Sequence, residues 1–251
     1  MTHFKQPSKS APRHEVSPTQ NSAKGSLQTI KSYVRRQGKI TAGQKRALLT
    51  LSEGWKWPFA GAPLAMEAIF ERPGPVVLEI GSGMGETTAQ IALAHPETNF
   101  LAVEVYHAGV GALMQRAEKN GLKNLKIIQD DAVAVMRDGI TADLLAGVHI
   151  FFPDPWPKKR HHKRRLLQAE FVALLVSRLK PGGYLHVATD WPDYAAQILE
   201  LLSAHPELRN ANLAGGFSPR PDTRPLTKFE QRGLRLGNPV ADLIFTRQIK
   251  N

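Results

Sequence analysis

Short apolar runs alternate with helix-length segments along this chain from Val76 onward. The runs have the length of buried strands, and Gly or Pro signals end several of the segments between them. We expect strands over Val76–Ile80, Phe100–Val105, Leu125–Gln129, Val148–Phe152, Tyr184–Ala188 and Leu243–Arg247. We expect helices over Pro63–Phe70, from a glycine turn to Ala94, and over 108–120, 132–137, 163–179 and 194–204. This order predicts an α/β fold with a doubly wound, mostly parallel sheet.

The same pattern divides the chain into three parts. Residues 1–30 are rich in Ser, Pro, Gln, Asn and Lys and nearly lack large apolar side chains. Burial cannot offset the ordering entropy of such a segment, so we expect a disordered basic tail. Residues 31–60 are expected to form a basic and aromatic extension, and residues 61–251 a single catalytic-type domain.

Charge adds a partner to this picture. The net charge of +11 comes from 33 Lys and Arg against 22 Asp and Glu. Residues 1–46 hold ten of the bases and one acid, a net +9, which leaves +2 for residues 47–251. Within that near-neutral body, Lys158–Arg165 holds six bases and two His. Two separate basic clusters favour a polyanionic partner such as nucleic acid, although a solvated tail and a charged helix face would have the same composition.

Composition also excludes several classes of protein. The chain has no Cys, which rules out a disulfide scaffold, thiolate metal sites and Cys nucleophiles. No apolar run reaches the roughly 20 residues of a membrane span, and Met1–Arg13 lacks the apolar core of a signal peptide. We therefore expect a cytoplasmic protein without a membrane partner, either a monomer or a homodimer.

A glycine turn, Gly81-Ser82-Gly83-Met84-Gly85, follows the first strand. Gly81 and Gly83 allow the backbone to approach a ligand, so we expect them to bind a cofactor. A dinucleotide fingerprint requires a third small residue at position 86, where this chain has Glu. The spacing therefore argues against a pyrophosphate ligand.

Three acidic residues, Glu104, Asp130 and Asp131, stand at successive strand ends around this turn. Glu104 stands where a carboxylate can bind both hydroxyls of a ribose, and Asp130 or Asp131 can accept from an adenine amino group. Carboxylates also tolerate a cationic ligand, so S-adenosylmethionine fits better than NAD. The alternative for each acid is a helix N-cap or a solvated turn residue.

A proline-rich loop follows the fourth strand, with the sequence Phe-Phe-Pro-Asp-Pro-Trp-Pro over residues 151–157. The prolines predict a rigid, non-helical loop. Asp154 can accept from the N1–H and the amino group of a guanine, and Trp156 offers a stacking surface. A plain turn with a core Trp is the alternative. The basic run that follows is expected to begin the next helix, where six cations oppose the helix dipole unless an anion neutralises them. His161 and His162 are adjacent, which is not zinc-ligand spacing on a helix, so we expect no metal.

These stretches together resemble the bacterial tRNA (guanine-N7)-methyltransferase family. The resemblance extends from Ser32 to Arg247, and its stretches are Ser32–Gly38, Glu79–Gly83, Phe151–Trp156 with the basic run, Ala188–Trp191 and Arg224–Gly233. The glycine stretch is common among methyltransferases, whereas the last three are specific. One departure is Pro157, where other members can carry a His.

The resemblance implies a seven-stranded, Rossmann-like class I methyltransferase domain with S-adenosylmethionine as methyl donor. It implies that Glu79, Glu104 and Asp131 contact the donor and that Asp154 is both catalytic and donor-contacting. The implied substrate-binding residues are Lys158, Asp190, Thr227, Lys228, Phe229 and Glu230. The implied RNA-contacting residues are Arg160, His161, His162, Lys163, Arg164 and Arg165. The implied substrate is the guanine at position 46 in the variable loop of tRNA.

Two other functions are compatible with parts of this pattern. The Pro153–Trp156 loop is loosely similar to the loop of enzymes that methylate exocyclic amines, but Trp156 stands where those enzymes have a second Pro. A non-enzymatic RNA-binding protein would explain the charge but not a glycine turn among three carboxylates. From the residues alone, the loop over 218–233 is equally compatible with a structural role.

Overall fold

The computed structural model describes residues 31–33, 38–235, 237 and 239–249, without the side chains of 228, 229 and 232. The expected disorder of residues 1–30 lies outside the described residues. Among the described residues, no helix combines the length and apolar character that a bilayer span requires.

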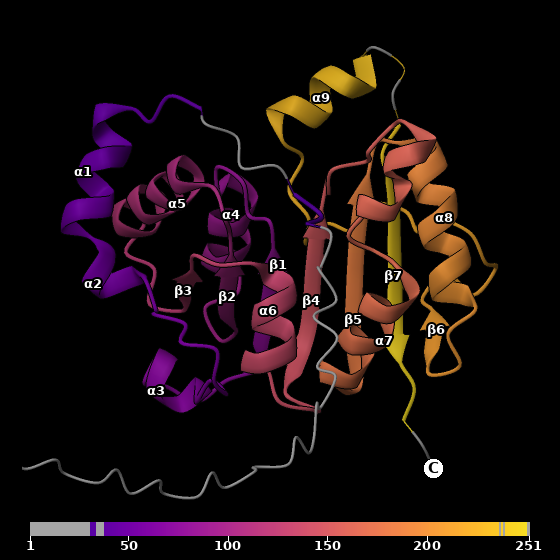
Figure 1. The fold of residues 1–251 in the computed structure, drawn as a ribbon, viewed down its shortest axis with the longest axis horizontal. Coiled ribbons are helices and arrows are strands. Elements are labelled where there is room, and N and C mark those ends of the chain that lie inside the picture. Colours follow the sequence, from indigo (N-terminus) through magenta and orange to yellow (C-terminus); the bar gives the residue numbers. More distant parts are fainter. Residues whose placement is uncertain (1–30, 34–37, 236, 238, 250–251) are drawn as a thin grey trace, which may run out of the picture. The chain divides into compact units, whose positions relative to one another are not determined.

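The centre of the fold is a seven-stranded sheet with the strand order β3-β2-β1-β4-β5-β7-β6 (Figure 1). Its strands are β1 (Val76–Ile80), β2 (Asn99–Val103), β3 (Leu125–Ile128), β4 (Leu145–Phe151), β5 (Leu179–Thr189), β6 (Leu208–Asn210) and β7 (Ala241–Arg247). The first five strands pair in parallel, and β7 is antiparallel to both β5 and β6. The predicted α/β class and the mostly parallel sheet are confirmed. The short edge strand β6 was not predicted from the sequence.

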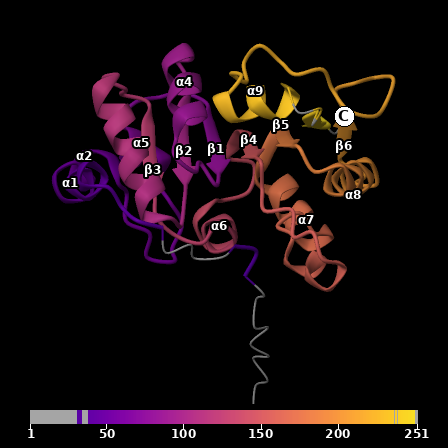
Figure 2. The same ribbon diagram turned by 90° about the horizontal axis from the view of Figure 1, so that it is seen from above.

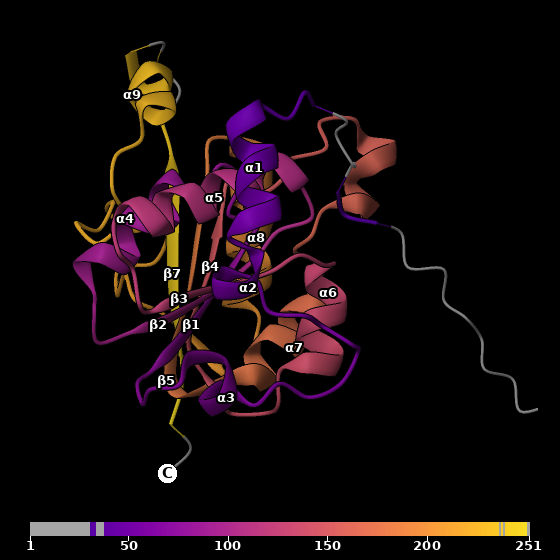
Figure 3. The same ribbon diagram turned by 90° about the vertical axis from the view of Figure 1, so that its left-hand side faces the viewer.

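Helices cover both faces of the sheet, as expected from strands that are apolar along their whole length (Figures 2 and 3). One face packs against α3 (Met66–Phe70), α7 (Ala169–Arg178) and α8 (Pro192–Ser203). The other packs against α4 (Glu86–Ala94) and α5 (His107–Lys119), and α1 (Ala42–Thr50) packs against α5. The remaining helices are α2 (Ser52–Trp55), α6 (Ala132–Ala134) and α9 (Lys228–Arg235), with a π-helical turn over Val135–Gly139.

The helix predicted over 163–179 is wrong at its beginning. The basic run instead forms a separate 3₁₀ helix, Lys159–Arg164, and α7 begins only at Ala169. The physical reason lies in Arg165, whose guanidinium turns inward to the carbonyl of Pro155 and to Gln197 and Asp193. The chain is extended at Arg165, so the basic residues lie outside the first turn of α7 and do not oppose its helix dipole.

Three further helices, α1, α2 and α9, lie where the sequence pattern predicted none. The loop expected to continue through Gly233 becomes α9 after Thr227, whose hydroxyl accepts from the backbone N–H of Glu230. In the extension, α1 begins with a capping box formed by Thr41 and Gln44. A Thr-x-x-Gln spacing is a readable helix-start signal, and it would have located α1.

Candidate functional site

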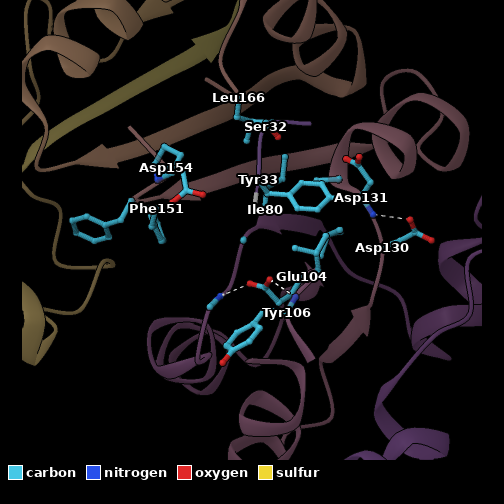
Figure 4. Close-up of a pocket in the computed structure, with 17 residues that line it drawn as sticks. Ser32, Tyr33, Ile80, Glu104, Tyr106, Asp130, Asp131, Phe151, Asp154 and Leu166 are labelled. Carbon is cyan, nitrogen blue, oxygen red and sulfur yellow. Dashed lines mark hydrogen bonds between the residues drawn. The ribbon is translucent and has the colours of Figure 1, made fainter. Parts of the chain in front are cut away.

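A cavity of about 340 Å³ lies at the carboxyl ends of β1 to β4 (Figure 4). Its walls include Gly81 and Gly83 from the turn after β1, Glu104 after β2, Asp131 after β3 and Asp154 after β4. These are five of the six residues predicted to bind a cofactor. They come together because parallel strands end at one edge of the sheet, next to the point where the strand order reverses between β1 and β4.

The glycine turn is held against the end of β2 by Glu104. One carboxylate oxygen of Glu104 accepts from the N–H of Gly83 at 2.7 Å, and the other from the N–H of Tyr106 at 2.8 Å. Gly83 has a φ of 55°, and a Cβ built on it would meet no atom within 4 Å. This glycine therefore supplies a backbone conformation and an open approach to the cavity. Burial raises the pKa of Glu104, although backbone N–H groups, those of Tyr106 and Gly83 among them, oppose the shift.

The glycine turn also depends on Gly109 of α5, a residue that was not predicted from the sequence. A Cβ on Gly109 would lie 2.3 Å from the carbonyl oxygen of Gly83. Helix α5 therefore approaches the glycine turn more closely than any side chain would allow. No single-sequence signal marks this position, because the glycine meets a segment distant in the chain.

Asp131 forms the helix N-cap that its position suggested, and its side chain also lies at the wall of the cavity. Its Oδ1 accepts from the backbone N–H of Val133 at 2.9 Å and caps α6. The same side chain lines the cavity beside Asp130, which in turn accepts from the N–H of Asp131. A helix cap thus holds one carboxylate at the wall of the cavity.

Glu79, by contrast, does not line the cavity. It lies on β1 with 3% of its surface exposed, and its Oε2 has no hydrogen-bond partner among the described residues. Burial raises its pKa to about 7, and the neighbouring Glu104 acts in the same direction. The side chain is therefore largely protonated in mildly acidic solution, where an exposed glutamate would be ionised.

Glu79→Gln should change how stability depends on pH in the cofactor-free protein. Below pH 4.5 both folded and unfolded wild type hold the proton, so the difference from Gln is constant. Between pH 4.5 and about 7 only the unfolded chain loses the proton, so wild type loses stability relative to Glu79→Gln as pH rises. We expect a relative loss of about 3 kcal/mol, which levels off above pH 7, measured by urea unfolding. The matched control is Glu200→Gln on the surface of α8. An equally flat difference for both variants would contradict the buried, protonated state of Glu79.

The Asp154 loop, residues 152–157, is strained and firmly held. Phe152 and Trp156 have φ values of 52° and 46°, which are costly for aromatic residues. The N–H of Phe152 bonds to the carbonyl of Ala188 on β5 at 2.7 Å, and the indole N–H of Trp156 to the carbonyl of Ser32 at 3.0 Å. The loop is non-helical, as the prolines predicted, and its anchors place Asp154 in the cavity wall.

The basic run divides into exposed and structural members. Lys158, Lys159, Arg160 and Lys163 are exposed, while His161 and His162 are half-buried. The guanidinium of Arg164 lies 4.0 Å from the ring centroid of Trp156, a cation–π geometry. Arg165 is 2% exposed and is used internally. Four cations are therefore free to face a polyanion beside the Asp154 loop.

The predicted substrate-binding residues lie at the same edge of the sheet. Asp190 follows β5, which is the neighbour of β4 in the sheet, and is half-buried. Thr227 precedes α9, and the side chains of Lys228 and Phe229 lie outside the described residues. Glu230 is 3% exposed and is paired with Arg224.

The structure adds Ser32 and Tyr33 to the cavity wall (Figure 4). Both residues belong to a stretch that carries the family resemblance, but no role was predicted for them. Nothing in their local pattern indicates a site that includes Asp154, about 120 residues further along the chain. Among the described residues, no group of three or more acidic or His side chains could hold a metal ion.

Known proteins share this architecture. The model of a family described as "Putative methyltransferase" matches residues 73–243. The solved structure of the 16S rRNA methyltransferase KamB aligns with a TM-score of 0.53 over 73% of this chain and 93% of that one, at 16% identity, which is a likeness of fold. Fold and site together define a Rossmann-like methyltransferase, an enzyme class whose methyl donor is S-adenosylmethionine.

Sequence relatives narrow the class. A tRNA (guanine-N(7)-)-methyltransferase of Bordetella pertussis is 62% identical over 218 residues, which are 87% of this chain and 85% of that protein. One of Nitrosospira multiformis is 57% identical over 219 residues, 87% of this chain and 95% of that protein. The chain belongs to the family of tRNA (guanine-N(7)-)-methyltransferases.

Proposed function

We propose that this enzyme transfers the methyl group of S-adenosylmethionine to N7 of the guanine at position 46 of tRNA, in the cytoplasm. The observation that carries the proposal is a cavity walled by three strand-end carboxylates and joined, through the Asp154 loop, to four exposed cations. Relatives of 57–62% identity named as tRNA (guanine-N(7)-)-methyltransferases support the choice of substrate.

The donor set of the cavity suits S-adenosylmethionine. Glu104 would accept from the ribose hydroxyls with lone pairs that Gly83 and Tyr106 do not use. Asp131 would accept from the adenine amino group, and Gly81 and Gly83 would let the ligand approach the backbone. Three carboxylates also favour a ligand that carries a sulfonium and an ammonium group. Glu79 lies outside the cavity wall, so we propose that it supports the turn and contacts the donor only after a local rearrangement.

Asp154 is the proposed catalytic residue. When bound, S-adenosylmethionine supplies an electrophilic methyl group on sulfur. Guanine N7 has an in-plane lone pair and no proton, so it would accept this methyl group directly, without a base among the residues of the site. The methylated ring is cationic. A carboxylate fixed beside it, as Asp154 is by the strained loop, would orient the guanine and stabilise the developing charge.

The remaining predicted residues would hold the RNA. We propose that Lys158, Arg160, Lys163 and their exposed neighbours contact the tRNA backbone and add affinity with little sequence discrimination. Asp190 and the residues Thr227–Phe229 would border the guanine, because they lie at the end of β5 and the start of α9 on the same edge of the sheet. Glu230 is buried and paired with Arg224, so its contribution would be indirect.

Product analysis tests the proposal. Bulk tRNA is incubated with the enzyme and S-adenosylmethionine labelled in the methyl group, digested, and the nucleosides are separated. We expect the label in N7-methylguanosine, and none when a transcript carries adenine at position 46. Label in an exocyclic amine would replace the proposed reaction by the alternative one. Label in N7-methylguanosine at a different position of the tRNA would support the proposed reaction but show that position 46 is not the target.

A further inference from the structure

Four buried polar side chains join α9 to the sheet. Arg224 bonds to both oxygens of Asp242 on β7 at 2.7 and 2.8 Å, and to both oxygens of Glu230 on α9 at 2.7 Å. His186 on β5 bonds to Asp242 at 2.7 Å. None of the four is more than 3% exposed. Burial would raise the pKa of Asp242, but the bonds to His186 and Arg224 lower it, so the carboxylate is held ionised.

Arg224 also faces the Asp154 loop. Its guanidinium carbon lies 5.9 Å from the ring centroid of Phe152, within cation–π range. Phe152 lines the proposed cofactor cavity, stands two residues before Asp154 and holds a strained backbone. One guanidinium therefore contacts β7, α9 and the loop that carries the proposed catalytic residue.

Most of the described side chains of α9 are exposed. It lies beyond the end of the sheet at which β7 begins (Figure 1). Gln231, Leu234 and Arg235 are exposed, whereas Glu230 points inward. A planar guanidinium with two bidentate carboxylates fixes the orientation of both partners, which a single contact would not do.

The same geometry limits what Glu230 can touch. Both of its oxygens accept from Arg224, and the residue is nearly fully buried. A nucleotide could reach this carboxylate only by breaking a buried bidentate ion pair, which would leave the guanidinium without one of its partners.

We propose that Arg224 is a positioning residue that sets α9 against the Asp154 loop, and that Glu230 supports tRNA binding through its ion pair with Arg224 rather than by contact with the nucleotide. This inference rests on the proposed function, since it concerns how tRNA is held at that site.

A double-mutant cycle separates the two roles of Glu230. The variants are Glu230→Gln, Arg224→Met and the double variant, with Asp222→Ala as a control on an exposed residue of the same loop. Each is measured for tRNA affinity by filter retention, for KM and kcat, for S-adenosylmethionine affinity by calorimetry, and for thermal unfolding. Assays are run well below the melting temperature of each variant.

We expect each single variant to weaken tRNA binding and raise KM for tRNA about tenfold, with S-adenosylmethionine affinity within twofold of wild type. In the Arg224→Met background, Glu230→Gln should cause no further loss, because its partner is already gone. A full additional loss in that background would overturn the proposal, and so would an unchanged KM in both singles. If Arg224→Met does not fold, Arg224→Lys replaces it, because it keeps the charge and loses the bidentate geometry.

The double-mutant cycle measures tRNA binding, so it still tests the coupling between Arg224 and Glu230 if product analysis finds a different methylated base. Failure of the proposed function would show in the wild-type product, whereas failure of this inference would show only in the coupling between Arg224 and Glu230.

Discussion

Asp154→Ala should lower the rate of methyl transfer to tRNA about 10³-fold, the scale seen when one preorganised electrostatic group is removed. The reason is that this carboxylate is the cavity-wall group on the Asp154 loop, beside which the guanine is proposed to become cationic. Filter retention of tRNA should change less than threefold, because the exposed cations remain. The measurement is single-turnover methylation with labelled S-adenosylmethionine, beside tRNA retention on the same preparation.

Asp154→Asn is the matched variant for this prediction, since it keeps the size and planarity of the side chain and removes only the charge. If charge stabilisation is the main effect, Asn should be nearly as slow as Ala. If orientation is the main effect, Asn should recover part of the rate. Near wild-type methylation by the alanine variant would remove Asp154 from the mechanism.

Neutralising the exposed cations should have the opposite effect to Asp154→Ala: tRNA binding should weaken, while methyl transfer at saturating tRNA is largely kept. With Lys158, Lys159, Arg160 and Lys163 replaced by alanine, we expect tRNA affinity at moderate salt to fall about 10²-fold and the slope of log K against log salt to flatten by about 3. Methyl transfer at saturating tRNA should stay within a few-fold of wild type, because none of these side chains lines the cavity. The measurement is a salt titration of filter retention.

An equal loss of charge elsewhere is the control for this variant. Lys119, Lys123, Lys180 and Arg209 are also exposed, and the first three lie near the amino-terminal ends of parallel strands, away from the cavity. Their replacement should leave the salt slope nearly unchanged. Equal effects from both quadruple variants would mean that net charge alone, and not the cluster beside the Asp154 loop, attracts the RNA.

The structure also shows why the members of the basic run could not all be given the same role from the sequence. Lys158 and Arg165 look alike in the chain, yet one is exposed and the other is buried against Asp193 and Gln197. Glu230 is a similar case. The resemblance assigned it to the substrate, and its depth and its pairing with Arg224 became visible only in the folded chain.

By itself, the sequence determined the sheet and the site that the sheet creates. Fully apolar strands between helices specify a parallel sheet, and parallel strands bring the residues that follow them to one edge. That is why Glu104, Asp154 and one of Asp130 and Asp131 could be placed together from local pattern, whereas the choice of Asp131 came from the family resemblance. Tertiary structure decided the features that depend on partners distant in the chain. These are the burial of Glu79, the approach of Gly109 to Gly83, the inward turn of Arg165 and the hold of Arg224 on α9. Each depends on which side chain fills the space opposite, and a local pattern carries no information about that.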